Sequence, residues 1–323
     1  MLKSPSSRRG ADDRSFRWGT GFFALLVALL VAAIAFELWR QSRLSIARFG
    51  FDFWKTGTWD PVSGDFGARP FIWGTLYSSF LAILISTPVA LGIAIFLSEL
   101  SPRFLRTPLA FLTELLAAIP SIVYGLWGVF VLVPVVRKLQ LLMPAWARKL
   151  PLFTGPPVGV GMLSAALILA VMVIPFTSSV AREVLKAVPQ TQREAAYALG
   201  ATRWEAIRVA MRYCRTGIIG AVILGLGRAI GETMAVTMVI GNSPTVSWSL
   251  FAPQYTMAAV IANEFTEAAD DLYLSALIEV GLVLFAITLI INVLSRLLIW
   301  SVSRDVKVPE PKEAAPAASG ASA

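Results

Sequence analysis

Two charged side chains, Arg228 and Glu232, lie inside an otherwise uncharged stretch, VILGLGRAIGETMAVTMVIG at residues 222–241. A charge at the centre of a bilayer costs roughly 2.5–3.5 kcal/mol on insertion scales. The spacing lets both side chains face one side of a helix, but such a pair contributes only about 0.2–0.5 kcal/mol in water. A guanidinium is well suited to binding a tetrahedral oxyanion. We therefore predict that Arg228 and Glu232 line the path of an anion, the alternative being a structural pair inside a helix bundle.

The elements that must hold this pair are membrane-spanning helices. The chain has 323 residues, of which 56% are apolar and 15% charged, whereas a soluble globular chain is about 25% charged. Six apolar stretches are each long enough to cross about 30 Å of hydrocarbon as a helix. They lie near residues 18–39, 71–98, 108–136, 158–180, 214–241 and 276–301. We predict an all-α membrane protein with six transmembrane helices in one domain over residues 18–302.

The distribution of Lys and Arg predicts the orientation of the chain. Basic residues precede the first apolar stretch, as in a secretory signal peptide, but the stretch is longer than a signal core of roughly 7–15 residues, so we expect an uncleaved helix. Lys and Arg are more numerous in the segments that would be cytoplasmic if the N-terminus lies inside. This predicts that residues 1–17 form a cytoplasmic N-terminal segment and that residues 303–323, rich in Ala, Pro and Ser, form a disordered cytoplasmic tail.

The composition also excludes several classes of chemistry. A single cysteine, Cys214, and the absence of His argue against an intramolecular disulfide, a zinc or iron site and His-dependent catalysis. No Lys stands in a Gly-x-x-x-x-Gly-Lys-Ser/Thr loop, so the chain has no site of that type for ATP. We expect neither an enzyme nor a cofactor-binding chain. The net charge of +8 is explained by basic residues beside the apolar stretches, and no nucleic-acid partner is expected.

The longest inner loop, about 181–213, contains two helix-start signals. Thr191 with Glu194 and Thr202 with Glu205 both have the spacing of a capping box. Gly200 lies between them and suits the left-handed conformation that ends a helix. The loop is therefore predicted to present a helix–turn–helix to the cytoplasm. The alternatives are a structured connector and, less favoured because both ends are tethered near lipid, a DNA-binding helix-turn-helix.

The same loop resembles a known family signature. EAAYALGATRWE, residues 194–205, is similar to the EAA loop of bacterial ABC importer permeases, with Glu194, Ala195, Ala196 and Gly200 matching and the later Ile-x-Leu-Pro missing. AAIPSIVYGLWG (117–128) and LGLGRAIGETMAVTMVIGN (224–242) resemble segments of PstC-type phosphate importer permeases. The resemblance covers roughly residues 15–305.

The resemblance implies a type I ABC importer permease fold in the inner membrane and an import function for inorganic phosphate. It implies that residues of about 189–213 form the coupling loop, and that Ala195 and Ala196 let an ATPase approach closely. It places Arg228 and Glu232 in the phosphate path. The expected partners are an ATPase dimer that carries ATP and Mg, a second PstA-like permease subunit, an external phosphate-binding protein and membrane lipid. A sulfate or molybdate permease, or an ion-coupled anion carrier or channel, remains the alternative.

Two further carboxylates are possible pathway residues. Glu114 and Glu279 each lie near an expected helix end, so a solvated or interfacial position is favoured for both. Ser121 and Tyr124 could line the same cavity as the charge pair. The outer loop 242–271 has an apolar middle that could dip back into the membrane.

Overall fold

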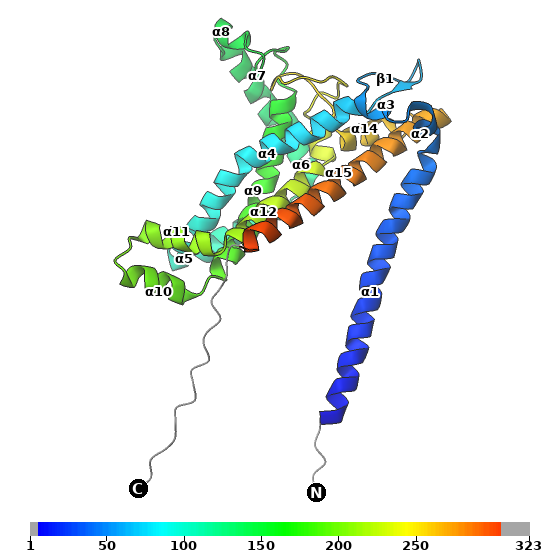
Figure 1. Cartoon of the computed structure of the whole chain (residues 1–323). Coiled ribbons are helices and arrows are strands. Elements are labelled where there is room, and N and C mark those ends of the chain that lie inside the picture. Colours follow the sequence, from blue (N-terminus) through cyan, green and yellow to red (C-terminus); the bar gives the residue numbers. More distant parts are fainter. Residues whose placement is uncertain (1–5, 305–323) are drawn as a thin grey trace, which may run out of the picture.

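The computed structural model describes residues 6–304 and, within them, the side chains of residues 16–302. Most of the chain is helical, as Figure 1 shows. In the first half the elements are α1 (Ser6–Gln41), α2 (Arg43–Phe49), α3 (Asp52–Lys55), β1 (Trp59–Asp60), β2 (Asp65–Phe66), α4 (Arg69–Ile95), η1 (Phe96–Leu100), α5 (Arg103–Ala118), α6 (Ser121–Trp127), η2 (Gly128–Leu132), α7 (Val133–Leu142) and α8 (Ala145–Arg148). In the second half they are α9 (Met162–Lys186), α10 (Gln190–Ala198), α11 (Arg203–Tyr213), α12 (Arg215–Ile230), α13 (Met234–Thr237), α14 (Met257–Glu264) and α15 (Asp271–Arg304).

Five helical segments are long and apolar enough to cross a membrane. They are Phe16–Gln41, Arg69–Leu100, Ser121–Leu142, Met162–Lys186 and Asp271–Val302. A sixth candidate consists of α11 and α12 together, which are bent by 71° at the break between them. Within this pair α12 is the apolar helix, whereas α11 is rich in charged residues. The predicted multi-pass helical membrane protein is confirmed.

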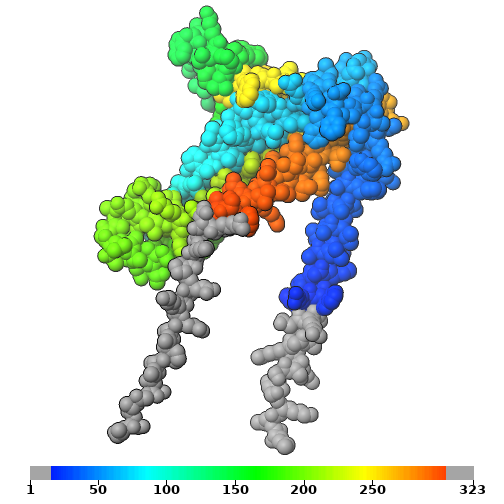
Figure 2. All heavy atoms as spheres, viewed as in Figure 1, coloured from blue at the N-terminus to red at the C-terminus, as the bar shows by residue number. Residues whose placement is uncertain are grey.

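The helical bundle is built around α9. This helix packs against α4, α12 and α5, and 61% of its most apolar window is buried within the chain. At the end of the bundle near the hairpin of α10 and α11, small residues on three helices (Ala94, Ala181 and Ala221) form a buried cluster. At the other end, α14 and the short β1–β2 hairpin pack on α4 and α15. Helix α1 stands apart from the bundle over most of its length (Figures 1 and 2). No residue of its apolar window is buried in this chain.

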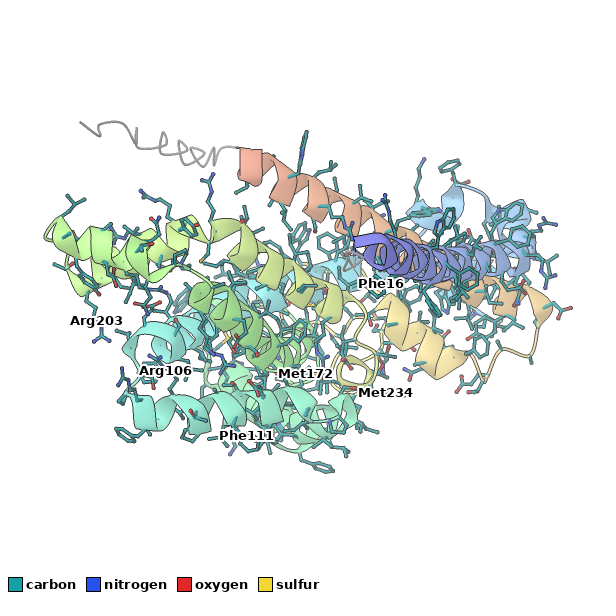
Figure 3. The ribbon with its side chains drawn as sticks, turned by 90° about the horizontal axis from the view of Figure 1, so that it is seen from below. Phe16, Arg106, Phe111, Met172, Arg203 and Met234 are labelled. Carbon is teal, nitrogen blue, oxygen red and sulfur yellow. The ribbon has the colours of Figure 1, made fainter. Side chains whose placement is uncertain are left out.

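The third predicted span, 108–136, is wrong in its boundaries. The structure divides this stretch into α5 and a separate spanning segment, Ser121–Leu142, with a break at Ile119 and Pro120. Both break residues have extended backbone, with ψ of 131° and 141°. The physical cause is Pro120, which lacks an N–H group and disfavours helical backbone in the residue before it. Average hydropathy does not reveal the break, since the helices on both sides of it are apolar. Helix α5, which carries Phe111, runs along one side of the bundle (Figure 3).

The predicted outer loop, residues 242–271, is packed into the protein rather than extended over it. Met257 and Ala259 of α14 are fully buried, and the Met257 N–H donates to the hydroxyl of Thr75 on α4 at 2.9 Å. The Trp73 indole N–H donates to the carbonyl of Ser247 at 2.9 Å, which ties the loop to the same helix. The apolar middle of the loop is therefore part of the core at this end of the bundle.

Gly74 of α4 is required by this packing, and Gly74→Ala is expected to lower the stability of the chain by about 1–3 kcal/mol, the usual range for overpacking. A Cβ atom at this position would overlap the carbonyl oxygen of Tyr255. The measurement is the thermal unfolding midpoint in detergent. Gly92→Ala is the matched control, because Gly92 lies on the same helix with no heavy atom within 4 Å of an added Cβ. Equal midpoints for the two variants would contradict the prediction.

Candidate functional site

Arg228 and Glu232 lie on either side of a break in the fifth predicted span. Helix α12 ends at Ile230, with Gly231 as its C-cap, and the next helix, α13, begins at Met234. The prediction of one continuous helix over 214–241 is therefore wrong, and the two residues do not share a helix face. Glycine is a poor helix former, and Gly225, Gly227 and Gly231 make the end of α12 easy to interrupt.

The two side chains have different environments. Arg228, in the last turn of α12, is exposed in this chain and interacts electrostatically with Tyr124. Glu232 is half-buried, and its Oε1 accepts a hydrogen bond from the Ala235 N–H at 3.3 Å. Among the described residues, the ion pairs within 4.0 Å do not include one between Arg228 and Glu232. In this conformation the carboxylate caps α13, and the guanidinium is left available to another anion.

The two sequence segments that resemble PstC-type permeases meet at this break. Helix α6, from the segment 117–128, packs against α13, from the segment 224–242. Gly125 allows the close approach: an added Cβ there would lie 3.1 Å from the Cα of Ala235 and 2.6 Å from the sulfur of Met238. Tyr124 is buried on the same helix, and its hydroxyl donates to the carbonyl of Leu116 at 2.8 Å across the α5–α6 break. In Figure 3, Met234 marks the start of α13 beside this contact.

The loop of about 181–213 forms the predicted helix–turn–helix. Helices α10 and α11 are joined at Gly200, whose φ of +81° is the left-handed conformation that the sequence predicts. Thr202 and Glu205 form the predicted capping box, with the Thr202 N–H donating to the Glu205 carboxylate at 2.7 Å. This hydrogen bond, together with that from the Thr202 hydroxyl, holds the pKa of the Glu205 carboxyl below its usual value.

The other predicted capping box is wrong. Helix α10 begins at Gln190 with Pro189 as its N-cap, so Thr191 lies inside the helix and caps nothing. Proline is well suited to the start of a helix, because its missing N–H would have no partner there. The Arg193 guanidinium instead fixes this end by donating to the carbonyls of Val188 and Leu185 at 2.8 and 2.9 Å.

The EAA residues are divided between the surface and the interior of the hairpin. Glu194, Ala195 and Gly200 are exposed, as a docking role requires, but Ala196 is 8% exposed and packs inside the hairpin. The largest exposed apolar groups were not part of the predicted site. They include Tyr197, Leu199 and Trp204, and Leu199 at the tip is 89% exposed. The sequence signal for them is the presence of bulky apolar residues on both sides of the turn glycine in a polar loop.

Gly200→Ala is expected to destabilise the hairpin by about 1–2 kcal/mol, the cost of left-handed backbone for a residue with a Cβ. The added methyl group meets no heavy atom within 4 Å, so the effect isolates backbone strain. Gly200→Asn should cost less, because Asn tolerates this conformation better. The measurement is hydrogen exchange of residues 190–213, which should rise more in the Ala variant than in the Asn variant. Unchanged exchange in the Ala variant would contradict the prediction.

The two additional carboxylates have different positions. Glu114 lies on α5 with a side chain that is 54% exposed in this chain, and it pairs with Arg182 of α9 at 2.8 Å. Glu279 of α15 is 3% exposed, so of the solvated and interfacial positions expected for it, the solvated one is wrong. The reason is that α2 folds back over α15, which the apolar pattern of α15 alone does not indicate.

The chain is similar in sequence to proteins with curated names. The chain is 47% identical over 301 residues to the phosphate transport system permease protein PstC of Mesorhizobium japonicum, covering 91% of this chain and 92% of the relative. It is 49% identical over 290 residues to PstC of Haemophilus influenzae, covering 88% and 92%.

Two further comparisons concern the fold and the family. The structure resembles an inward-facing conformation of the MetNI methionine ABC transporter, with a TM-score of 0.55 at 16% identity, covering 72% of this chain and 94% of that chain. This likeness confirms the importer permease fold. Residues 89–306 match the family described as "Binding-protein-dependent transport system inner membrane component". The chain therefore belongs to the binding-protein-dependent transport system inner membrane components.

Proposed function

We propose that the chain is the membrane-spanning permease subunit of an ATP-driven importer that moves inorganic phosphate across the inner membrane. The observation that carries the proposal is Arg228, an exposed guanidinium at the broken end of α12 inside a membrane domain. Phosphate as substrate is supported by identity near one half to relatives named phosphate permeases. In this role the chain is a transport subunit and not an enzyme.

The hairpin of α10 and α11 is the proposed docking surface for an ATPase. It projects from one end of the bundle (Figures 1 and 2). It also exposes apolar side chains there, among them Leu199 at its tip. ATP and Mg would be bound by a dimer of that ATPase, outside this chain. A second, PstA-like permease subunit would complete the pathway, and an external phosphate-binding protein would deliver substrate at the opposite end. Both termini would then lie in the cytoplasm.

The connection between α11 and α12 links movement of the hairpin to the position of the anion site. Cys214 alone separates the two helices, which meet at 71°. A displacement of the hairpin by the ATPase would therefore rotate or shift α12, whose last turn carries Arg228. Arg228 would bind the phosphate oxygens by charge-assisted hydrogen bonds. Alternating access would follow from rocking of the spanning helices, as in other domain-closure transitions.

The proposal is tested by uptake of labelled phosphate into vesicles that contain the complete transporter, with and without ATP. We expect uptake to require ATP and to be insensitive to an excess of sulfate or molybdate. Uptake of sulfate or molybdate in preference to phosphate would leave the fold assignment intact and contradict the assignment of phosphate as the substrate. Uptake driven by an ion gradient, with no ATPase bound, would favour the carrier alternative.

A further inference from the structure

Glu99 makes a contact with each helix of the hairpin. It lies in η1, the π-helical end of the α4 span. Its carboxylate Oε1 accepts a hydrogen bond from Nη2 of Arg193, on α10, at 2.6 Å. Its backbone carbonyl accepts from Nη2 of Arg203, on α11, at 2.5 Å. These two hydrogen bonds form the Glu99 clamp, in which one residue at the end of a spanning helix holds both helices of the hairpin.

The Glu99–Arg193 pair is less exposed than other ion pairs at this end of the bundle. Its side chains are 14% and 16% exposed, whereas those of Glu183 and Lys186 are 59% and 44% exposed. Exposed pairs contribute little to stability because solvent screens them, and that argument applies less to a pair shielded in this way. The same Arg193 also donates to the carbonyls of Leu185 and Val188 at and just beyond the end of α9. Arg193 thus ties the ends of α4 and α9 to α10.

The backbone around Glu99 is suited to accepting hydrogen bonds from the hairpin. The last carbonyls of a helix have no partner within the helix, so they are free to accept hydrogen bonds from other elements. Short π-helical turns occur frequently at functional sites. The guanidinium of Arg203 takes one such carbonyl, that of Glu99. Arg203 is labelled at the hairpin end of the molecule in Figure 3, together with Arg106 of α5.

The covalent connections of the hairpin do not include α4. The chain leads from α9 into α10 through Ala187–Pro189 and from α11 into α12 through Cys214. Helix α4 is joined to the hairpin through Glu99, and it packs against both α9 and α12. Movement of the hairpin is therefore passed to α4 through these hydrogen bonds, beside the apolar cluster in which Met211 of α11 packs with Ala94 of α4.

We infer that Glu99 is a positioning residue that transmits movement of the α10–α11 hairpin to α4, so that α4, α9 and α12 respond together. The inference rests on the proposed function, in which an ATPase moves the hairpin. Loss of the clamp leaves the docking surface present, because the exposed tip residues do not contact Glu99 in any described hydrogen bond or ion pair. The defect should therefore appear in coupling, as ATP hydrolysis without matching transport.

The test compares Glu99→Ala and Glu99→Gln with wild type in the complete transporter in vesicles. Three quantities are measured for each: ATPase bound, ATP hydrolysed and substrate taken up per ATP. We expect the ATPase to remain bound and uptake per ATP to fall about tenfold in Glu99→Ala, the size expected from losing a charge-assisted hydrogen bond. Glu99→Asp, which keeps the charge, should retain more coupling than Glu99→Gln.

Two controls separate transmission from general damage. Glu183→Gln removes another paired carboxylate at this end of the bundle and should leave uptake per ATP unchanged. Arg193→Met should reproduce the coupling defect. The Glu99→Ala/Arg193→Met double variant should lose no more coupling than the more severe single variant, because the effects of two substitutions that break the same contact are not additive.

Two results would overturn the inference. Unchanged uptake per ATP in both Glu99→Ala and Glu99→Gln would show that the clamp transmits nothing. Loss of ATPase binding in both variants would show that Glu99 supports docking instead of transmission. If the wild-type transporter moves a different oxyanion, uptake per ATP is measured with that oxyanion. Only the assignment of phosphate as the substrate then fails. Hydrogen exchange of residues 190–213, expected to rise in Glu99→Ala and not in Glu183→Gln, tests the clamp whatever the substrate.

Discussion

Arg228→Gln is expected to lower ATP-driven phosphate uptake at least about tenfold, since hydrogen bonds to charged groups contribute roughly 1.5–3 kcal/mol. Arg228 is exposed at the broken end of α12, and the nearby carboxylate of Glu232 caps α13 instead of pairing with it. Gln keeps a hydrogen-bond donor and much of the length but removes the charge, so the variant isolates electrostatic binding of the anion. The measurement is the initial rate of labelled phosphate uptake in vesicles.

The control for this prediction is another exposed arginine of a spanning helix. Arg296→Gln, on α15, should leave uptake near the wild-type rate. Arg228→Lys should be intermediate, because an ammonium keeps the charge and loses the planar fork of donors. Copurification of the ATPase is checked for each variant. Wild-type uptake by an assembled Arg228→Gln complex would show that the arginine is structural and that the anion path lies elsewhere.

Glu232→Gln should have a smaller effect on uptake than Arg228→Gln, because the amide oxygen of Gln can still accept from the Ala235 N–H. The same uptake assay measures it. A loss as large as that of Arg228→Gln would indicate that the negative charge of Glu232 acts on the anion or the gate, and that capping of α13 is secondary.

Leu199→Asp is expected to reduce binding of the ATPase at least about tenfold, because a charged group in place of a buried anchor leaves that charge desolvated in the interface. Leu199 stands at the tip of the hairpin and is 89% exposed in this chain. A leucine this exposed gains free energy only when a partner covers it. The measurement is the amount of ATPase that copurifies with the complex at increasing dilution.

An equally exposed leucine at the opposite end of the bundle provides the matched control. Leu142, at the end of α7, is 82% exposed, and Leu142→Asp should leave ATPase binding intact. Phosphate uptake by Leu199→Asp should fall together with binding. Full ATPase binding by Leu199→Asp would contradict the assignment of the hairpin tip as the docking surface.

The chemistry of short segments determined much of the fold. Long apolar runs specified α1, α4, α9 and α15, because each run must be shielded from water over the thickness of a bilayer and a helix satisfies its backbone internally. The turn at Gly200 and the capping box at Thr202 were also predictable, since both depend on residues within one turn of each other. Arg228 was conspicuous because a charge in an apolar run is costly.

Other features were decided by contacts between segments that are distant in the sequence. The pattern of residues 214–241 indicates a continuous helix, yet the chain breaks after Ile230 where α13 packs on α6 and Glu232 caps the new helix start. The burial of Glu279 depends on α2 folding back over α15.

The Glu99 clamp likewise joins residues about a hundred positions apart in the sequence. The composition and residue spacing of a segment indicate whether that segment is more stable in the membrane or in water. Which polar groups find partners, and which stay available to a ligand, depends on the tertiary structure, because those partners come from other helices.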